Sequence, residues 1–161
     1  MFLEMKVFGL TIDPFTNVPI VILKDSDEKN ALPVWIGVLE ASAIASELEK
    51  IHFSRPMTHD LLKEVLRNLE VTVKKIEVND LKDNVYYAVI HMAGKSGSFT
   101  LDARPSDAIA LALRMGAPIF VDSDVLEKSK SMDMSKGQGK RDKGAGDLAE
   151  TLEDLPPENF G

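Results

Sequence analysis

Residues 102–116, with the sequence DARPSDAIALALRMG, decide how this chain folds. The part from Ser106 to Met115 is apolar on nearly every side, and a helix of that kind is expected to be buried. Gly116 is well placed to end it, because glycine readily adopts the left-handed conformation found at helix C-termini. The stretch therefore predicts a buried helix with the short segment Ala117–Val121 as a strand after it.

The rest of the chain contains apolar stretches of two periods, separated by turn residues. Helical spacing occurs over Glu40–Phe53 and again from Thr58 to Leu69. Strands are predicted at residues 3–12, 18–24, 31–36, 71–78, 85–92, 98–103 and 117–121. The order is β-β-β-α-α-β-β-β-α-β, in which hairpin connections outnumber helical crossovers. The sequence thus predicts an α+β fold with a mixed, largely antiparallel sheet and three main helices.

Composition limits the classes of protein to which the chain can belong. It has 161 residues, 44% of them hydrophobic, which is enough for one domain with a substantial core. It has no cysteine, which excludes disulfides, thiolate metal sites and cysteine nucleophiles and fits the cytoplasm. The net charge of −7 argues against a protein that coats nucleic acid. No apolar run is long enough for a membrane span, and the N-terminus lacks the pattern of a signal peptide.

The apolar pattern also predicts where the domain ends. It supports an ordered domain over residues 1–127. Residues 128–146 (KSKSMDMSKGQGKRDKGAG) have almost no large apolar side chains and are expected to form a flexible linker. Residues 147–161 contain acids and no base, and are expected to form an acidic tail.

Two stretches of the chain have similar sequences, residues 55–61 (RPMTHDL) and 102–108 (DARPSDA). Each has arginine and proline, then a hydroxyl residue, then an acid, then helix formers. The proline favours an extended conformation of the preceding arginine, and Thr58 and Ser106 are expected to be the N-cap residues of their helices. Two similar elements can face each other across a pseudo-two-fold axis and form one pocket.

Such a pocket has the chemistry of an anion site. Arg55 and Arg104 could bind phosphate beside the helix N-termini, together with Thr58 and Ser106. The candidates for catalysis are His59 as general acid or base, with Asp60, Arg104 and Asp107. The alternative is that both stretches are ordinary helix starts, with the arginines in salt bridges to nearby acids.

A divalent cation such as Mg²⁺ or Mn²⁺ is a further possibility, because hard cations need oxygen ligands. The candidate ligands are Glu40 and Asp102, together with Asp60 and Asp107 from the two Arg-Pro stretches. No spacing in the sequence marks these carboxylates as a metal site.

Several longer motifs occur together in the chain: LPVWIG at residues 32–37 followed by Glu40-Ala41, RPMTHDL at 55–61, DARPSDAIALA at 102–112 and APIFV at 117–121. Together they resemble one known family, the bifunctional nuclease (BFN) domain family. The resemblance covers about residues 1–127, and the final PENFG resembles the tail of bacterial members. It implies an α+β fold with a duplicated β-rich unit, oligomeric assembly, and nuclease activity on DNA and RNA.

Three functions remain open on the sequence. The chain could be a phosphodiesterase acting on DNA or RNA, a non-catalytic oligomeric module that binds a small anionic ligand or a partner protein, or a fold in which the Arg-Pro elements are only structural. A homo-oligomer, most simply a dimer, is expected from the apolar third helix and from apolar strands with a proline at the edge.

Overall fold

The computed structural model describes residues 1–139, with the side chains of residues 1–132. Over these residues the chain forms one seven-stranded sheet in the order β3-β2-β1-β7-β4-β5-β6, with four helices. The strands are β1 (Phe2–Ile12), β2 (Pro19–Lys24), β3 (Ala31–Trp35), β4 (Thr72–Lys82), β5 (Val85–Gly94), β6 (Gly97–Ala103) and β7 (Ile119–Asp122). The helices are α1 (Val38–Leu48), α2 (Thr58–Asn68), α3 (Pro105–Met115) and α4 (Ser123–Gly139).

The sheet is mixed and largely antiparallel, as predicted. Every pair of neighbouring strands is antiparallel except β4 and β7, which run parallel. All seven predicted strands and the three predicted helices are confirmed, and α4 is an additional helix. The α+β fold class is therefore established.

The topology contains one unit twice. The meander β1-β2-β3 is followed by α1, and the meander β4-β5-β6 is followed by α3, with β7 between the two meanders. The two Arg-Pro stretches do not mark this repeat. Arg104 precedes α3, but Gly37 stands at the equivalent place before α1, and Arg55 precedes α2, which has no counterpart in the second unit.

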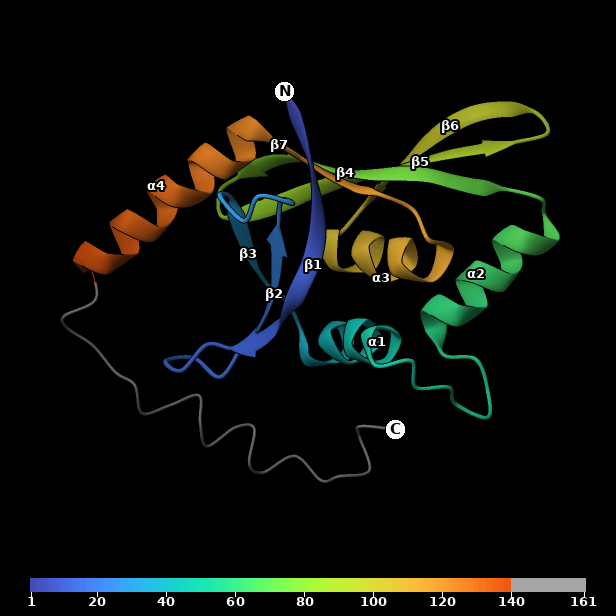
Figure 1. Ribbon diagram of the computed structural model, residues 1–161, viewed down its shortest axis with the longest axis horizontal. Helices are drawn as coiled ribbons and strands as arrows, with labels where there is room; N and C mark the ends of the chain where they lie inside the picture. Colours follow the sequence, from blue (N-terminus) through green and yellow to red (C-terminus); the bar gives the residue numbers. More distant parts are fainter. Residues whose placement is uncertain (140–161) are drawn as a thin grey trace.

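Helix α3 lies on the concave side of the curved sheet, next to α1 and α2 (Figure 1). Residues 108–112 are completely buried, which confirms the burial predicted for this helix. Pro105 occupies the first helical position, where its fixed φ suits a helix start. Gly116 ends the helix with a φ of 65°. Because its own chain covers α3, this helix cannot be the contact between subunits on which the expectation of a dimer partly rested.

The domain does not end at residue 127 as predicted. Helix α4 continues from Ser123 to Gly139, so residues 128–139 are helical rather than a linker. Ser129 is buried and accepts a hydrogen bond of 3.2 Å from Tyr86 Oη, and Met132 packs against the core one turn later. The buried serine explains the error, because a small polar residue at a core position interrupts the apolar pattern. The rest of the predicted linker and the predicted tail lie outside the described residues. Neither α4 nor any other helix within residues 1–139 has the length and apolar character to cross a membrane.

Candidate active site

Charged side chains from three helices form one hydrogen-bonded network, here called the Arg104 network. Arg104 donates from Nε to Asp107 Oδ2 at 2.8 Å and from Nη1 to Glu40 Oε1 at 2.9 Å. His59 Nε2 lies 2.9 Å from Asp107 Oδ1. The network therefore joins α1, α2 and α3, and it brings the two Arg-Pro motifs together as the sequence analysis expected.

Neither predicted hydroxyl cap is an N-cap. In α2 the N-cap is Met57, and the carboxylate of Asp60 accepts a hydrogen bond from its backbone N–H at 3.1 Å. In α3 the N-cap is Arg104, because Pro105 takes the first helical position and moves Ser106 one place into the helix. Thr58 and Ser106 thus lie in the first turns, next to the site but not as caps.

Asp60 forms its ion pair with a second arginine, Arg114, which the sequence analysis did not predict as a site residue. Arg114 donates from Nε to Asp60 Oδ1 at 2.7 Å, from Nη1 to the Ala110 carbonyl and from Nη2 to the Ala43 carbonyl, both at 3.0 Å. Its side chain is only 3% exposed. The pair holds α1, α2 and α3 together, so its part in the fold is structural. The available signal was one basic residue after an apolar run, Arg114 following residues 108–113 within the helix, because a buried charge needs a partner.

Two other predicted residues do not join the network. Arg55 is exposed, and no hydrogen bond or ion pair connects it to the described residues. Asp102 is in register with Val89 on β5, whereas the neighbouring Ala88 and Ile90 belong to the core beneath α3. Cross-strand partners share a face of the sheet. Asp102 therefore lies on the opposite face from Glu40.

The arrangement of the carboxylates does not fit a divalent cation. No group of three or more His, Asp or Glu side chains that could hold a metal ion occurs in the described part of the chain. The oxygens of Glu40 and Asp107 already accept hydrogen bonds from Arg104. A cation there would have to compete with a guanidinium group.

A pocket of about 270 Å³ borders the network. Gly37, Glu40, Arg104 and Ser106 line one side of it. A Cβ at Gly37 would collide with the Glu40 carboxylate, so the glycine leaves room for Glu40 beside Arg104. The Arg104 side chain is 65% exposed, and within the described residues no hydrogen bond uses its Nη2 group. Arg104 thus lines the pocket and keeps a pair of N–H donors that no described residue accepts.

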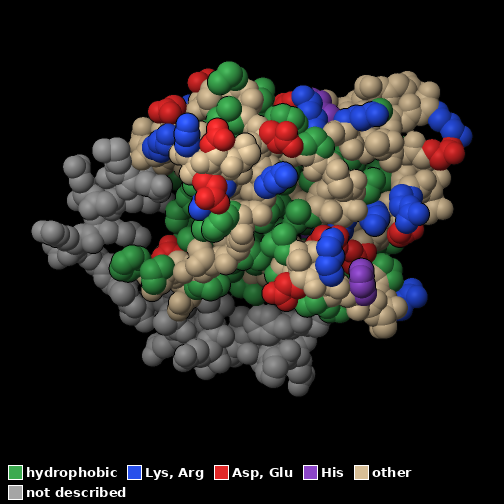
Figure 2. All heavy atoms as spheres, in the orientation of Figure 1, with side chains coloured by type: hydrophobic (Ala, Val, Ile, Leu, Met, Phe, Trp, Pro, Cys, Tyr) green, Lys and Arg blue, Asp and Glu red, His purple; other side chains and the backbone are tan. Residues whose placement is uncertain are grey.

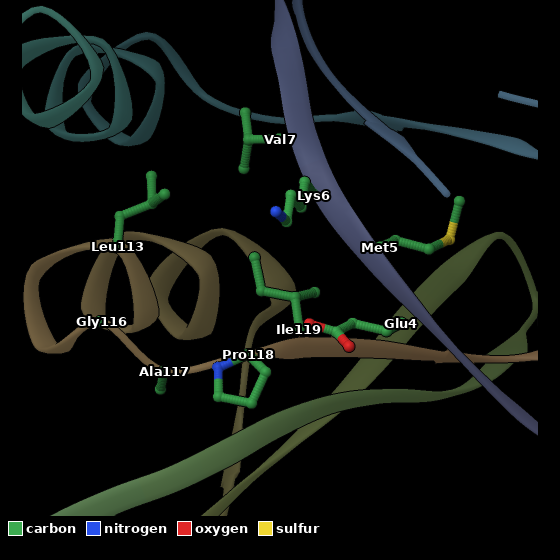
Figure 3. A pocket seen from close by; sticks show the side chains of 9 residues that line it. All are labelled: Glu4, Met5, Lys6, Val7, Leu113, Gly116, Ala117, Pro118 and Ile119. Carbon is green, nitrogen blue, oxygen red and sulfur yellow. The ribbon is translucent and has the colours of Figure 1, made fainter. Parts of the chain in front are cut away.

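A larger pocket, of about 400 Å³, lies where β1 diverges from β7 near the end of α3. Glu4 and Lys6 of β1, Leu113 of α3 and Pro118 line it (Figure 3). It shares no residue with the Arg104 network. On the face seen in Figure 2, basic and acidic side chains are interspersed rather than gathered into one basic patch.

The network stabilises the charged form of Asp107. Burial alone would raise the pKa of this carboxyl, but the hydrogen bonds from Arg104 and His59 outweigh it and hold the pKa below its usual value. The bonds to Asp107 and Glu40 in turn raise the pKa of Arg104. Burial would likewise raise the pKa of Asp60, and the hydrogen bond from Arg114 lowers it below the usual value.

These lowered pKa values predict a loss of stability in acid. Both carboxylates stabilise the folded state at a pH above their unfolded-state pKa of about 4. That contribution is lost as the pH falls through the lower pKa of the folded state. We therefore expect the free energy of unfolding, measured with urea, to fall below about pH 5 less steeply in Asp60→Asn than in the wild type. Asp27→Asn is the matched control, because Asp27 is exposed and forms no ion pair within the described residues. Equal slopes for Asp60→Asn and the wild type would contradict this role of Asp60.

Comparison with known proteins places the chain in a family. The bifunctional nuclease domain model matches residues 21–133, which run from within β2 into α4 and include the whole Arg104 network. An uncharacterized protein of Mycobacterium tuberculosis is 35% identical over 126 residues, covering 78% of this chain and 75% of that protein.

The plant relatives are more distant and much longer. Bifunctional nuclease 2 of Oryza sativa subsp. japonica is 27% identical over 117 residues, covering 70% of this chain and 36% of the rice protein. Bifunctional nuclease 2 of Arabidopsis thaliana is 25% identical over 105 residues, covering 63% and 32%. The chain spans about a third of the length of these plant proteins. The family match over most of the domain shows that this chain belongs to the bifunctional nuclease domain family.

Proposed function

We propose that this chain is a nuclease that hydrolyses phosphodiester bonds of DNA or RNA at the Arg104 network, where Arg104 connects the pair His59 and Asp107 to the pocket. The observation that carries the proposal is the contact between His59 and Asp107, 2.9 Å long, next to an arginine with free donors that borders a pocket. The family and the names of the plant relatives support the same class of reaction.

In this proposal His59 is the general base. A carboxylate can only accept, so Asp107 fixes the proton of His59 on Nε2 and leaves Nδ1 with a free electron pair. Nδ1 takes the proton of the attacking oxygen, from water or from an RNA 2′-hydroxyl. That oxygen bonds to phosphorus, and the bond from phosphorus to the leaving oxygen breaks with its electron pair. Asp107 stabilises the imidazolium that forms.

Arg104 provides the electrostatic part of the reaction. Its Nη2 group donates to the phosphate and stabilises the charge that builds up on the phosphate oxygens in the transition state. Ser106 lines the same pocket and is a further donor. Arg55, which is exposed, and Thr58 would contact neighbouring phosphates. In this proposal the nucleic acid lies across the N-termini of α2 and α3.

The dependence of cleavage on Mg²⁺ or Mn²⁺ is to be measured, and the proposed mechanism uses no metal ion. The paired carboxylates do not fit a cation as they stand, so no step is derived through one. We expect cleavage to persist in excess EDTA. The protein is expected to act in the cytoplasm, in keeping with the absence of cysteine.

The second candidate is a module that binds a small anionic ligand without cleaving it. The interspersed charges of Figure 2 and the net charge of −7 favour a short anion over a long polyanion. The pocket of about 270 Å³ is also small. Binding of a mononucleotide with no turnover of any oligonucleotide would favour this candidate.

A matched pair of histidine variants tests the nuclease. We expect His59→Asn to lower kcat on 5′-labelled single-stranded RNA or DNA by about 10²–10⁴-fold, the usual contribution of a general base. His52→Asn is the control, because His52 is exposed and has no hydrogen-bond partner within the described residues. The assay uses protein whose activity co-elutes with the chain, in EDTA, Mg²⁺ and Mn²⁺. Equal cleavage by both variants would remove His59 from the mechanism.

A further inference from the structure

The pocket of about 270 Å³ beside the Arg104 network has a lining of two kinds. The charged part, with Glu40 and Arg104, belongs to the network. The rest is mainly apolar and aromatic and comes from the end of β3, the residue after it and the start of β5, namely Val34, Trp35, Ile36, Val85 and Tyr86. An anion alone needs only the charged part. The apolar part therefore suits a ligand that carries a large uncharged group next to its anion.

Tyr86 extends across the interval between β5 and β3. Its backbone belongs to β5, while its Oη donates to Ser129 Oγ of α4 at 3.2 Å and lies 3.4 Å from the carbonyl oxygen of Pro33 on β3. These contacts hold the ring in one position, and the residue is half-buried. A fixed aromatic ring in the lining of a pocket provides a surface on which another flat ring can stack.

The turn between β4 and β5 adds a polar side chain to the same pocket. Lys82 pairs with Val85, so the turn consists of Asp83 and Asn84, which have positive φ values of 51° and 64°. Turns of this kind favour glycine at the second position, yet Asn84 carries a side chain there and lines the pocket. Its amide forms no hydrogen bond within the described residues. One donor group and one acceptor are thus available to a ligand.

We propose that this pocket is a nucleobase subsite for single-stranded nucleic acid. The base belongs to the nucleotide whose phosphate binds Arg104. It packs against Tyr86 and Val85, and the side-chain amide of Asn84 forms hydrogen bonds with its edge. Adenine presents a donor next to an acceptor, the pattern that an asparagine amide matches with two hydrogen bonds. Adenine is therefore the expected base.

A subsite of this kind selects single strands. A base enters a pocket only when it is unpaired and unstacked, so base recognition by stacking is typical of single-stranded nucleic acid. The net charge of −7 agrees with this mode of binding, because a protein with little attraction for a long run of phosphates needs affinity from another source. Contacts with the base provide it.

This inference rests on the proposed function, since it takes the ligand of Arg104 to be a nucleotide. Its test measures binding and uses no cleavage, so the two can fail separately. Cleavage without any contribution of the base to affinity would leave the nuclease and remove the subsite. Binding through the base without cleavage would leave the subsite and remove the nuclease.

The first test compares three small ligands by isothermal titration calorimetry on the full chain. We expect adenosine 5′-monophosphate (AMP) to bind about 10-fold more tightly than ribose 5-phosphate, which lacks the base, because stacking of one base contributes about that much. Adenosine, which lacks the phosphate of AMP, should also bind more weakly than AMP. Equal affinities for AMP and ribose 5-phosphate, or no binding of AMP at millimolar concentration, would overturn the proposal.

The second test uses the two residues of the turn as a matched pair. Both Asn84→Gly and Asp83→Gly suit the positive φ, so each should keep a Tm at least as high as that of the wild type. The preference for AMP over ribose 5-phosphate should fall several-fold in Asn84→Gly and stay unchanged in Asp83→Gly, because Asp83 does not line the pocket. This ratio is not affected by the lost charge of Asp83, which acts on both phosphates alike. An unchanged ratio in Asn84→Gly would remove Asn84 from base recognition and contradict the proposal.

A third measurement addresses the preference for single strands. A single-stranded adenine oligonucleotide should displace AMP from the wild type, and the same strand in a duplex should displace it much less. Equal displacement by the two forms would contradict a subsite that takes up an unstacked base.

Discussion

Replacing Arg114 with alanine is expected to lower the free energy of unfolding by about 3–5 kcal/mol, the usual cost of breaking a buried ion pair by removing one partner. The Arg114 side chain is 3% exposed, and its guanidinium binds Asp60 as well as two backbone carbonyls, from α1 and from α3 itself. The variant leaves these acceptors unpaired and a cavity among three helices. Unfolding in urea, followed by far-UV circular dichroism at pH 7, measures the loss.

The matched control is Arg67→Ala. Arg67 is 62% exposed, and its one ion pair within the described residues is with Glu64, so its removal should change the stability by less than about 1 kcal/mol. Arg114→Lys should recover only part of the loss, because one ammonium group cannot replace three separately directed donors. If Arg114→Ala proved to be as stable as Arg67→Ala, the ion pair between Arg114 and Asp60 would not be what holds the helices together.

Unlike Arg114→Ala, the variant Arg104→Ala is expected to lose activity and to keep its stability. We expect kcat for phosphodiester cleavage to fall by about 10²–10³-fold, as for the loss of a donor that stabilises charge in the transition state. Stability should change by less than about 1 kcal/mol, because the side chain is 65% exposed and its ion pairs are accessible to solvent. Cleavage kinetics and urea unfolding on the same preparation give both quantities.

Arg104→Lys tests whether the positive charge alone is sufficient for activity or whether the directed N–H donors of the guanidinium are needed. Lysine keeps the charge but cannot hold Glu40 and Asp107 while donating to a phosphate, so its activity should also be low. Arg67→Ala again serves as the control and should cleave like the wild type. A large loss of stability in Arg104→Ala with unchanged activity would assign Arg104 to the structure rather than to the reaction.

The sequence predicts most of this fold because its strongest patterns are local. The strands follow from apolar stretches between turn residues, and α3 from an apolar helix followed by glycine. Helix α4 was missed because Ser129, a small polar residue, stands at a buried position and obtains its partner from Tyr86 on β5. Such long-range compensation leaves no periodic signal in the sequence.

The site was predictable only in part, for similar reasons. The repeated motifs led to the expectation that five side chains would form one pocket: Arg55, His59, Asp60, Arg104 and Asp107. His59, Arg104 and Asp107 do come together. Asp60 pairs with Arg114 instead, and Arg55 has no partner among the described residues. The separation of Asp102 from them depends on strand register, where a shift of one residue reverses the face. The role of Arg114 depends on which acid reaches it from another helix, and the sequence does not encode that pairing locally.

The most direct test of the central claim, that His59 and Asp107 act as one catalytic unit beside Arg104, is a double-mutant cycle on cleavage. His59→Asn, Asp107→Asn and the double variant are compared with the wild type under single-turnover conditions in EDTA. Because Asp107 acts through His59, the double variant should lose no more activity than His59→Asn alone. Losses that multiply in the double variant, or cleavage that survives both substitutions, would contradict the account.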